Sequence, residues 1–399
     1  MTDDREFSDL LKLADKDHAS VTELTRDLVR IPSRGGIDFY EPVLDRMEAW
    51  LAENGLPCRR LTGPGDMTVA LVSEVDGASP GPRYVLDACL DTASFGDENG
   101  WTHPPTSGEI VDGWMYGRGS ADSKVGAAIF AHLMVRLQSI THGSVVLLYD
   151  LDEHTGGFGG AKVYFEGPDA PDRVDGVMIG YPGIEHVVVG GRGVLRARVH
   201  VHGVAGHSGG SKSTPNAIAK AATLVHELHS VQLPSAVESG FPLPGKLTVT
   251  AISAGEGYSV VPDLCTFNVD IRLTPAFDDT SAAELLRSVA GDVDGRWPGT
   301  RPTEVEISTR WPPYALAVDS PLRTALLGAA AEAGLSTSAK IAGPSNIGNY
   351  LAGLGIPATA GFGVDYVGLH GTDERIRLET VPRIQAAYHQ ALLTLLRPA

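Results

Sequence analysis

Four short polar segments carry side chains that can bind a metal ion or transfer a proton. They are residues 87–91 (Asp-Ala-Cys-Leu-Asp), 117–124 (Gly-Arg-Gly-Ser-Ala-Asp-Ser-Lys), 150–157 (Asp-Leu-Asp-Glu-His-Thr-Gly-Gly) and 368–374 (Gly-Leu-His-Gly-Thr-Asp-Glu). Carboxylates, imidazoles and thiolates are the usual protein ligands of zinc, and glutamate is a common general base. Apolar runs precede the first and third segments, as is typical of sites at strand ends in open parallel sheets.

The elements that must position these segments alternate between helix and strand. Apolar spacing predicts helices over residues 20–29 and 41–53 and from residue 124, and strands over 68–72, 84–90, 144–151 and 177–180. In the helix from residue 124, Val125, Ile129, Leu133 and Leu137 recur at four-residue spacing and predict a buried stripe. Short apolar strands between helices favour an α/β fold with a mostly parallel sheet.

A different pattern occupies residues 192–309. The expected order is strand, helix, strand, strand, helix, strand, which is a ferredoxin-like α+β unit. On the first of these strands, His200 and His202 occupy the polar face and are expected to be exposed, whereas Cys265 on a later strand is expected in the core. The predicted organisation is one α/β catalytic domain formed by residues 1–191 and 310–399, with 192–309 inserted.

Composition narrows the classes of partner. The 399 residues carry a formal net charge of −17, which disfavours nucleic acid and anionic membrane surfaces. No apolar run reaches the roughly 18 residues of a membrane span, and the acidic N-terminus lacks a signal-peptide pattern. The three cysteines are too few for a disulfide framework. We therefore predict a cytoplasmic protein that acts on a small molecule.

A spaced set of motifs resembles a known superfamily. Trp101, the run Gly-Trp-Met-Tyr-Gly-Arg-Gly at 113–119, Asp122 and Lys124 are its most specific elements. From about residue 20 to the end, the chain resembles the zinc-dependent superfamily of acetylornithine deacetylase, succinyl-diaminopimelate desuccinylase, glutamate carboxypeptidase and the aminoacylases. The resemblance implies that residues 192–309 form a lid and dimerisation domain, and hence a homodimer.

The resemblance also implies a set of metal positions, some of which are altered here. Asp122 matches the aspartate that bridges two metals, and His370 matches the last histidine ligand. His154 stands where the superfamily has a glutamate ligand. Cys89 and Tyr181 replace a histidine and an acidic ligand, respectively, and both belong to the same metal position. Glu153 falls on the general base.

These changes predict one tightly bound divalent metal, held by Asp122, His154 and His370. Two imidazoles and a carboxylate suit zinc, and iron, cobalt, nickel or manganese are alternatives. Cys89 and Tyr181 are poor ligands for a second metal, although a Cys89 thiolate paired with Asp122 could hold a second zinc. Packing of a strand end is an equally weighted interpretation of Cys89.

Other roles follow from the resemblance alone. His207 is implied to stabilise the oxyanion in the partner subunit's site. Arg272 is implied to bind a substrate carboxylate, and Asn346 is a further predicted substrate-binding residue. Asp91 is implied to orient a metal ligand, but Cys89 offers it no second nitrogen, so capping of the loop is the alternative. Arg272 could instead be a surface strand arginine.

The function that these residues predict is metal-dependent hydrolysis of an amide bond in an N-acyl amino acid or small peptide. One alternative is a non-hydrolytic enzyme on the same scaffold, amide-forming, cyclising or eliminating, with one metal or none. The other is a catalytically silent ligand-binding homologue, which the retained Glu153, Asp122 and His370 disfavour.

Overall fold

The computed structural model describes residues 3–234 and 241–398, and the chain divides into two units. Unit 1 comprises Met1–Val189, Leu316–Lys340 and Ile356–Ala399, and unit 2 comprises Gly190–Ala315 and Ile341–Gly355. The segment Ile341–Gly355 therefore lies outside the stretch 192–309 that the sequence pattern marks. The side-chain amide of Asn349 donates to the carbonyls of Arg192 and Pro312 at 3.1 and 2.9 Å, which ties this segment to unit 2.

Unit 1 is built on one six-stranded sheet with the order β1-β2-β6-β3-β7-β17. Its strands are β1 (Cys58–Thr62), β2 (Thr68–Asp76), β3 (Ser79–Cys89), β6 (His142–Asp150), β7 (Gly176–Ile179) and β17 (Ala358–Thr359). The neighbours β6–β3, β3–β7 and β7–β17 are parallel, whereas β1–β2 and β2–β6 are antiparallel. The predicted α/β fold with a mostly parallel sheet is thus confirmed.

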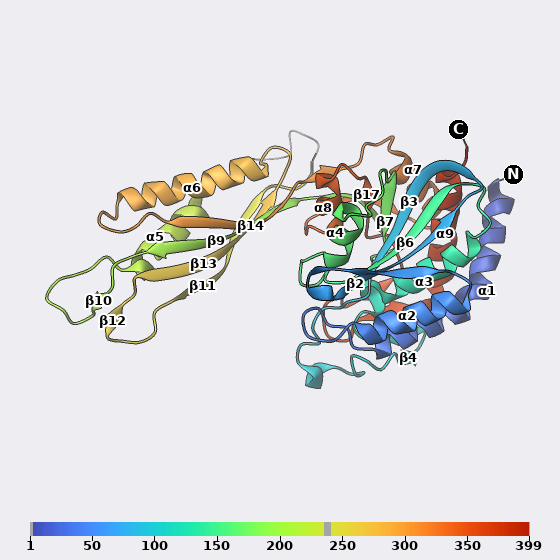
Figure 1. The fold of residues 1–399 in the computed structure, drawn as a ribbon, viewed down its shortest axis with the longest axis horizontal. Helices are drawn as coiled ribbons and strands as arrows, with labels where there is room; N and C mark the ends of the chain where they lie inside the picture. Colours follow the sequence, from blue (N-terminus) through green and yellow to red (C-terminus); the bar gives the residue numbers. More distant parts are fainter. Residues whose placement is uncertain (1–2, 235–240, 399) are drawn as a thin grey trace. The chain divides into compact units, whose positions relative to one another are not determined.

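Helices α1 (Asp3–Arg30), α3 (Val125–Arg136), α7 (Pro321–Glu332) and α9 (Val381–Leu395) bring both ends of the chain together in unit 1 (Figure 1). α9 contacts α1, α3 and α7, and α3 also packs on β3 and β6. The stripe predicted on α3 is fully buried. α2 (Glu41–Glu53) and α4 (Gly159–Glu166) pack on β1 and β2.

A second, small sheet in unit 1 has the order β18-β19-β5-β4. Its strands are β18 (Tyr366–Val367), β19 (Arg375–Arg377), β5 (Trp114–Tyr116) and β4 (Ile110–Val111). After β5 the chain forms the turn Ser120–Lys124 and enters α3. The loop between β18 and β19 contains His370, so this sheet brings two of the polar segments close together.

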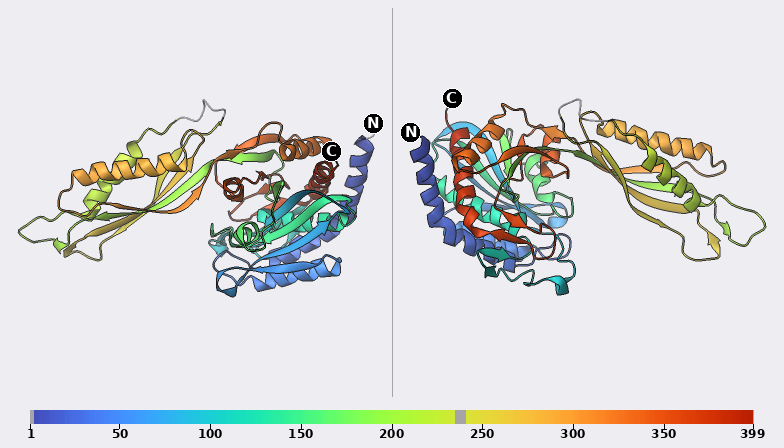
Figure 2. Two further views of the ribbon diagram at one scale, coloured as in Figure 1. Left: turned by 45° about the horizontal axis from the view of Figure 1, so that its top comes forward. Right: turned by 180° about the vertical axis from the view of Figure 1, so that it is seen from behind.

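Unit 2 contains an antiparallel sheet with the order β11-β13-β9-β14 and two helices that share one core with it (Figure 2). The elements are β9 (Gly193–His202), α5 (Ala217–Ser230), β11 (Lys246–Ala254), β13 (Leu264–Leu273), α6 (Asp279–Gly295) and β14 (Glu304–Trp311), with a short pair β10 (Gly206–His207) and β12 (Val260–Val261). This is the expected ferredoxin-like order, and Cys265 lies in the core as predicted.

The prediction that His202 is exposed is wrong. Its side chain is buried, with Nε2 at 3.1 Å from Glu304 and Nδ1 at 3.0 Å from Arg301. These two partners follow α6 and are distant in sequence, so strand alternation alone does not reveal them. His200, which precedes it on the same face, is only partly buried.

Among the described residues, no helix combines the length and the apolar character needed to cross a membrane.

Candidate metal centre

Asp122 lies between two histidines that come from distant parts of unit 1. Its Oδ2 atom is 2.7 Å from His370 Nε2 and 3.4 Å from His154 Nε2. Asp122 belongs to the turn before α3, His154 to the loop after β6, and His370 to the loop between β18 and β19. Ligand atoms of all three residues lie within 4.8 Å of one another. The structure therefore brings together the three residues predicted to bind the metal.

A buried ion pair joins two of these segments. Arg118 and Glu374 form a salt bridge, and their side chains are 2% and 0% exposed. Glu374 Oε1 accepts hydrogen bonds from the backbone N–H of Ala121 at 3.0 Å and of Asp122 at 3.3 Å. Arg118 also donates to the carbonyl of His370 at 3.0 Å. Because the pair holds Asp122 and His370 in place at once, it is a functional feature that sequence reasoning missed.

Lys124 anchors the same turn from its other end. Its Nζ atom donates to the carbonyls of Leu28 and Ile31 at 2.8 and 2.9 Å, where α1 ends. Burial lowers the pKa of Lys124 to about 7. The side chain thus donates hydrogen bonds to carbonyl groups that have no donor within the helix, because they lie at its C-terminal end.

The electrostatics of the group suit a divalent cation. Burial alone would raise the pKa of Asp122, but contacts with His154 and His370 lower it below its usual value. Burial alone would lower the pKa of His154, but contacts with Asp122 and Asp91 raise it to about 11. Among the described residues, Asp122 Oδ1 and His154 Nδ1 are buried without a hydrogen-bond partner. Two imidazoles and a carboxylate in this arrangement fit a zinc-like ion.

Glu153 precedes His154 and is partly buried. Its backbone N–H donates to Asp91 Oδ1 at 3.1 Å. Burial and the negative charge of Asp122 raise the pKa of Glu153 well above its ordinary value. A carboxylate with a raised pKa next to a metal centre can both accept and return a proton.

Cys89 ends β3 beside the same centre. Its Sγ atom is 3.5 Å from Ser123 Oγ, and Cys89, Asp91 and His154 form a second group with ligand atoms within 4.8 Å of one another. Burial, together with nearby carboxylates, raises the pKa of the Cys89 thiol well above its usual value. Because the thiolate is the form that binds metals, this environment makes Cys89 a weak ligand.

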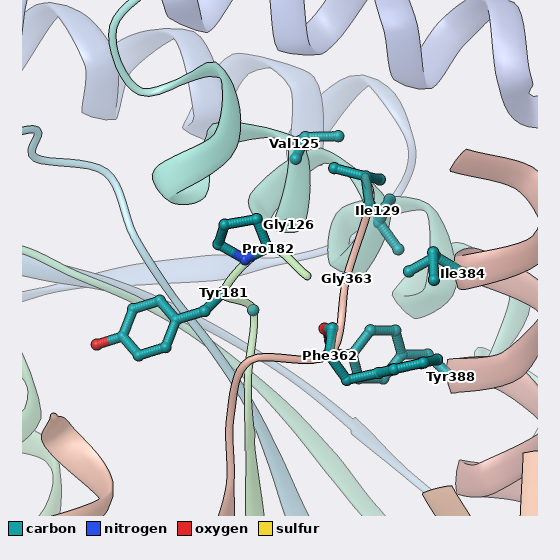
Figure 3. Close-up of a pocket in the computed structure, with 11 residues that line it drawn as sticks. Val125, Gly126, Ile129, Tyr181, Pro182, Phe362, Gly363, Ile384 and Tyr388 are labelled. Carbon is teal, nitrogen blue, oxygen red and sulfur yellow. Dashed lines mark hydrogen bonds between the residues drawn. The ribbon is translucent and has the colours of Figure 1, made fainter. Parts of the chain in front are cut away.

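Tyr181 follows β7 and lines a small apolar pocket. The pocket is bordered by Val125, Gly126, Ile129, Gly180, Tyr181, Pro182, Phe362, Gly363, Val364, Ile384 and Tyr388. Figure 3 shows the phenol ring of Tyr181 pointing away from Ile129, Ile384 and Tyr388. Its neutral hydroxyl is a weak ligand at best.

The remaining predicted site residues belong to unit 2. Arg272 Nη1 donates to Ser345 Oγ at 3.1 Å, and its Nε atom is 2.7 Å from Asp270. Asn346 begins α8 (Ile347–Gly353), where its side chain accepts from Gly348 N–H at 2.8 Å. Arg272 and Asn346 are therefore close neighbours, through Ser345.

His207 lies at the other end of unit 2. It is in β10, is exposed, and its Nδ1 atom accepts from Gly209 N–H at 3.0 Å. β10 follows the end of β9 that pairs with Leu264, whereas Arg272 lies at the opposite end of β13. Within unit 2 the structure thus separates His207 from Arg272.

A second arginine accompanies Arg272, and sequence reasoning missed it. Arg192 donates to the carbonyl of Gly343 at 3.0 Å. Burial and the positive charge of Arg272 lower the pKa of Arg192. Two neighbouring guanidinium groups favour an anionic ligand.

The fold and the donor set define a metal-dependent hydrolase. The sequence matches the model of Peptidase family M20/M25/M40 over residues 86–394, and the chain belongs to this family. The protein is accordingly a metallo-amidohydrolase, and the resemblance inferred from its motifs is confirmed.

Sequence relatives and solved structures agree with this assignment. Succinyl-diaminopimelate desuccinylase of Rhodospirillum centenum is 31% identical over 288 residues, which cover 69% of this chain and 73% of the relative. The enzyme of the same name from Cereibacter sphaeroides strain ATH 2.4.9 is 32% identical over 298 residues, or 71% and 74% of the two chains.

Two solved structures share the fold. An M20 metallo-carboxypeptidase from Sulfolobus solfataricus superimposes with a TM-score of 0.74 at 16% identity, covering 93% of this chain and 98% of the other. The YXEP protein of Bacillus subtilis, described as a dinuclear metal-binding M20 peptidase, has a TM-score of 0.72 at 18% identity, covering 96% and 99%.

Proposed function

We propose that the protein hydrolyses the amide bond of an N-acyl amino acid or small peptide that bears a carboxylate. The observation that carries this proposal is the group of Asp122, His154 and His370, with Glu153 beside it, in a chain of the M20 family. The desuccinylase relatives act, by their names, on an N-acyl substrate, which supports the same class here.

In the proposed reaction the chain's own residues move the proton and hold the substrate. A divalent cation at Asp122, His154 and His370 supplies Lewis acidity, which lowers the pKa of water and polarises a carbonyl group. Glu153 accepts the proton of the attacking water and returns it to the amine nitrogen as the C–N bond breaks. Its raised pKa favours the return of this proton.

Unit 2 supplies the residues proposed to bind the substrate. Arg272 and Arg192 present two guanidinium groups near Ser345, and a guanidinium binds a carboxylate through two parallel hydrogen bonds. Asn346, although it caps α8, lies next to Ser345 and is proposed to bind the substrate with these arginines. His207 is proposed to donate a hydrogen bond to the oxyanion, a role that its exposure leaves open.

We further propose that one metal per chain is sufficient for activity. Metal-depleted protein titrated with zinc should gain hydrolysis of a panel of N-acyl amino acids, and the activity should saturate at one equivalent. The reason is that Cys89 and Tyr181 are weak donors, whereas Asp122, His154 and His370 remain good ones. Chelation should abolish the activity.

Elemental analysis of the saturated protein gives the matching metal content. Saturation only at two equivalents would contradict the single-metal proposal. No hydrolysis at any metal loading would contradict the hydrolase and favour a non-hydrolytic enzyme or a ligand-binding protein.

A homodimer formed through unit 2 is also proposed. Several exposed apolar side chains of this unit lie on α5 and β11 and around the paired segments β10 and β12, namely Val204, Ile218, Ile252, Tyr258, Val260 and Leu264. Among the described residues, β11 lies at the edge of its sheet. Edges and apolar patches of this kind are typical of surfaces that another chain covers.

If His207 acts in the partner subunit's site, two inactive variants should complement each other. Mixed dimers of His207→Ala and Glu153→Gln subunits should regain part of the wild-type activity, because one site of the mixed dimer then has both intact residues. Recovery is measured after exchange of differently tagged subunits. Verified mixed dimers without activity would rule out this role for His207.

A cytoplasmic location and a small-molecule substrate belong to the same proposal. The net charge of −17 supports them, since it disfavours nucleic acid and anionic membranes.

A further inference from the structure

We infer that Asp91 is a positioning residue for His154, and that it holds this imidazole with Nδ1 protonated so that Nε2 faces the metal site. The inference deepens the proposed metal centre and rests on it. In the superfamily pattern Asp91 follows a histidine ligand two positions earlier, which is Cys89 in this chain. The structure gives Asp91 a different imidazole, contributed by the loop after β6.

Among the described residues, the polar contacts of the Asp91 side chain lead to the segment that carries His154. Oδ1 accepts from the backbone N–H of Glu153 at 3.1 Å, and Oδ2 accepts from that of His154 at 2.9 Å. The same Oδ2 is 3.3 Å from His154 Nδ1, while His154 Nε2 is 3.4 Å from Asp122 Oδ2. The ring therefore lies between two carboxylates, one at each nitrogen.

This arrangement matches a general feature of metal-bound histidines. The ring nitrogen that does not bind the metal usually donates its N–H to a carboxylate, which fixes both the tautomer and the ring orientation. Nδ1 lies 3.3 Å from Asp91 Oδ2 without forming a hydrogen bond in the structure, and the inferred Nδ1–H donates to this carboxylate when Nε2 binds the metal. Nε2 then faces Asp122 Oδ2, which is 3.4 Å away. His154 can then act as a ligand at a position where the superfamily uses a carboxylate.

The pair is enclosed, so it is not an exposed ion pair. The side chain of Asp91 is 0% exposed and that of His154 is 8% exposed. Gly35 closes the site from the loop after α1: a Cβ atom at this position would lie 3.1 Å from Asp91 Oδ2 and 3.2 Å from His154 Cβ. A backbone hydrogen bond of 2.9 Å from Gly35 N–H to the carbonyl of Thr92 holds that loop in place.

The competing arrangement is a metal bound by Cys89, Asp91 and His154 Nδ1. These three residues also have ligand atoms within 4.8 Å of one another. In that case Nδ1 would bind a metal and could not donate to Asp91. The two arrangements predict opposite protonation of Nδ1, so a direct measurement distinguishes them.

The first experiment measures zinc affinity by competition with a chromophoric chelator. Asp91→Asn should weaken zinc binding by about 10- to 100-fold, which is usual for loss of the carboxylate behind a metal-bound histidine. Asp87→Asn is the matched control, because Asp87 is buried in the same strand, β3, and its carboxyl oxygens have no hydrogen-bond partner among the described residues. It should bind zinc like the wild type.

A double-mutant cycle separates positioning of the imidazole from support of the loop backbone. In a His154→Glu background the imidazole is gone but the two backbone N–H groups remain. There, Asp91→Asn should leave zinc affinity unchanged or improve it. An equal loss of affinity in both backgrounds would overturn the inference, because Asp91 would then act only through the backbone.

Nuclear magnetic resonance of the zinc-loaded protein, labelled with ¹⁵N-histidine, supplies a readout that does not depend on turnover. A protected Nδ1–H of His154 should be present in the wild type and absent in Asp91→Asn. A metal-bound Nδ1, or a wild-type protein that binds no zinc, would overturn the inference. Zinc binding with the expected Nδ1–H but without amide hydrolysis would overturn only the proposed function.

Discussion

Replacing Glu153 by glutamine is expected to lower turnover of the N-acyl substrate by about 10²- to 10⁴-fold, the usual effect of removing a general base. The amide keeps the size of the side chain but cannot accept a proton from water. The backbone N–H that donates to Asp91 is unchanged by the substitution. Zinc content and substrate affinity should therefore stay close to those of the wild type.

Single-turnover rates and calorimetric binding of the substrate separate the two effects. Glu185→Gln is a suitable control, because Glu185 is an exposed glutamate in the same unit. It should keep normal activity. If Glu153→Gln retained near-normal turnover, Glu153 would have no part in proton transfer, and another group would have to supply the base.

Short-range patterns in the sequence predict much of unit 1. The apolar spacing of residues 41–53 predicts α2 with the bounds found in the structure, and the stripe from Val125 to Leu137 predicts the buried face of α3. Strands of continuous apolar residues predict the central strands β3, β6 and β7. Such patterns report whether each residue is buried, and burial suffices to place these elements.

The start of α1 shows where such patterns fail. The helix begins at Asp3 rather than near residue 20. Its buried stripe includes Leu10, Ala14 and Val21, but Asp17 interrupts it. Asp17 is satisfied by Gln385 at 2.8 Å and by Arg136, neither of which is near it in sequence. A polar residue inside the apolar stripe breaks the helical pattern, so the pattern does not predict the first part of this helix unless the partners of the polar residue are known.

The candidate site, too, is predicted only in part from the sequence. The motifs that resemble the superfamily are enough to select Asp122, His154 and His370, because each falls on one of its metal-ligand positions. They do not predict the Arg118–Glu374 pair or the contact of Asp91 with His154, since both depend on side chains from separate loops. The position of Asn349, which brings Ile341–Gly355 into unit 2, is another long-range contact of this kind.

Two buried carboxyl groups beneath the site lead to a prediction about stability. Asp87 in β3 and Asp150 at the end of β6 are 1% and 0% exposed, and none of their carboxyl oxygens has a hydrogen-bond partner among the described residues. Asp150 pairs in register with Cys89, which shares a sheet face with Asp87 because side chains alternate along a strand. The two acids therefore occupy the same apolar face.

The free energy of unfolding is expected to fall as pH rises from about 4 to about 8, because these groups bind protons more tightly in the folded chain. Burial raises the pKa of Asp87 to about 8, and burial together with Asp87 raises that of Asp150 well above its usual value. An unfolded aspartate has a pKa of about 3.9, so the folded state holds the extra protons across this range. The stabilisation by these protons is complete below the pKa of the unfolded aspartate. It is lost as pH rises through the raised pKa of each group in the folded chain.

Asp87→Asn should remove most of the pH dependence that Asp87 gives to the free energy of unfolding, since the amide stays neutral at every pH. Each pKa unit corresponds to about 1.4 kcal/mol, so the stability of the variant relative to the wild type should rise by several kcal/mol, on the order of 5, between pH 4 and pH 8. Urea unfolding of metal-free protein at several pH values measures the change. Asp319→Asn, at an exposed aspartate, should follow the wild type. Parallel curves for the wild type and Asp87→Asn would show that Asp87 is ionised in the folded protein and that a partner for its charge exists in solution.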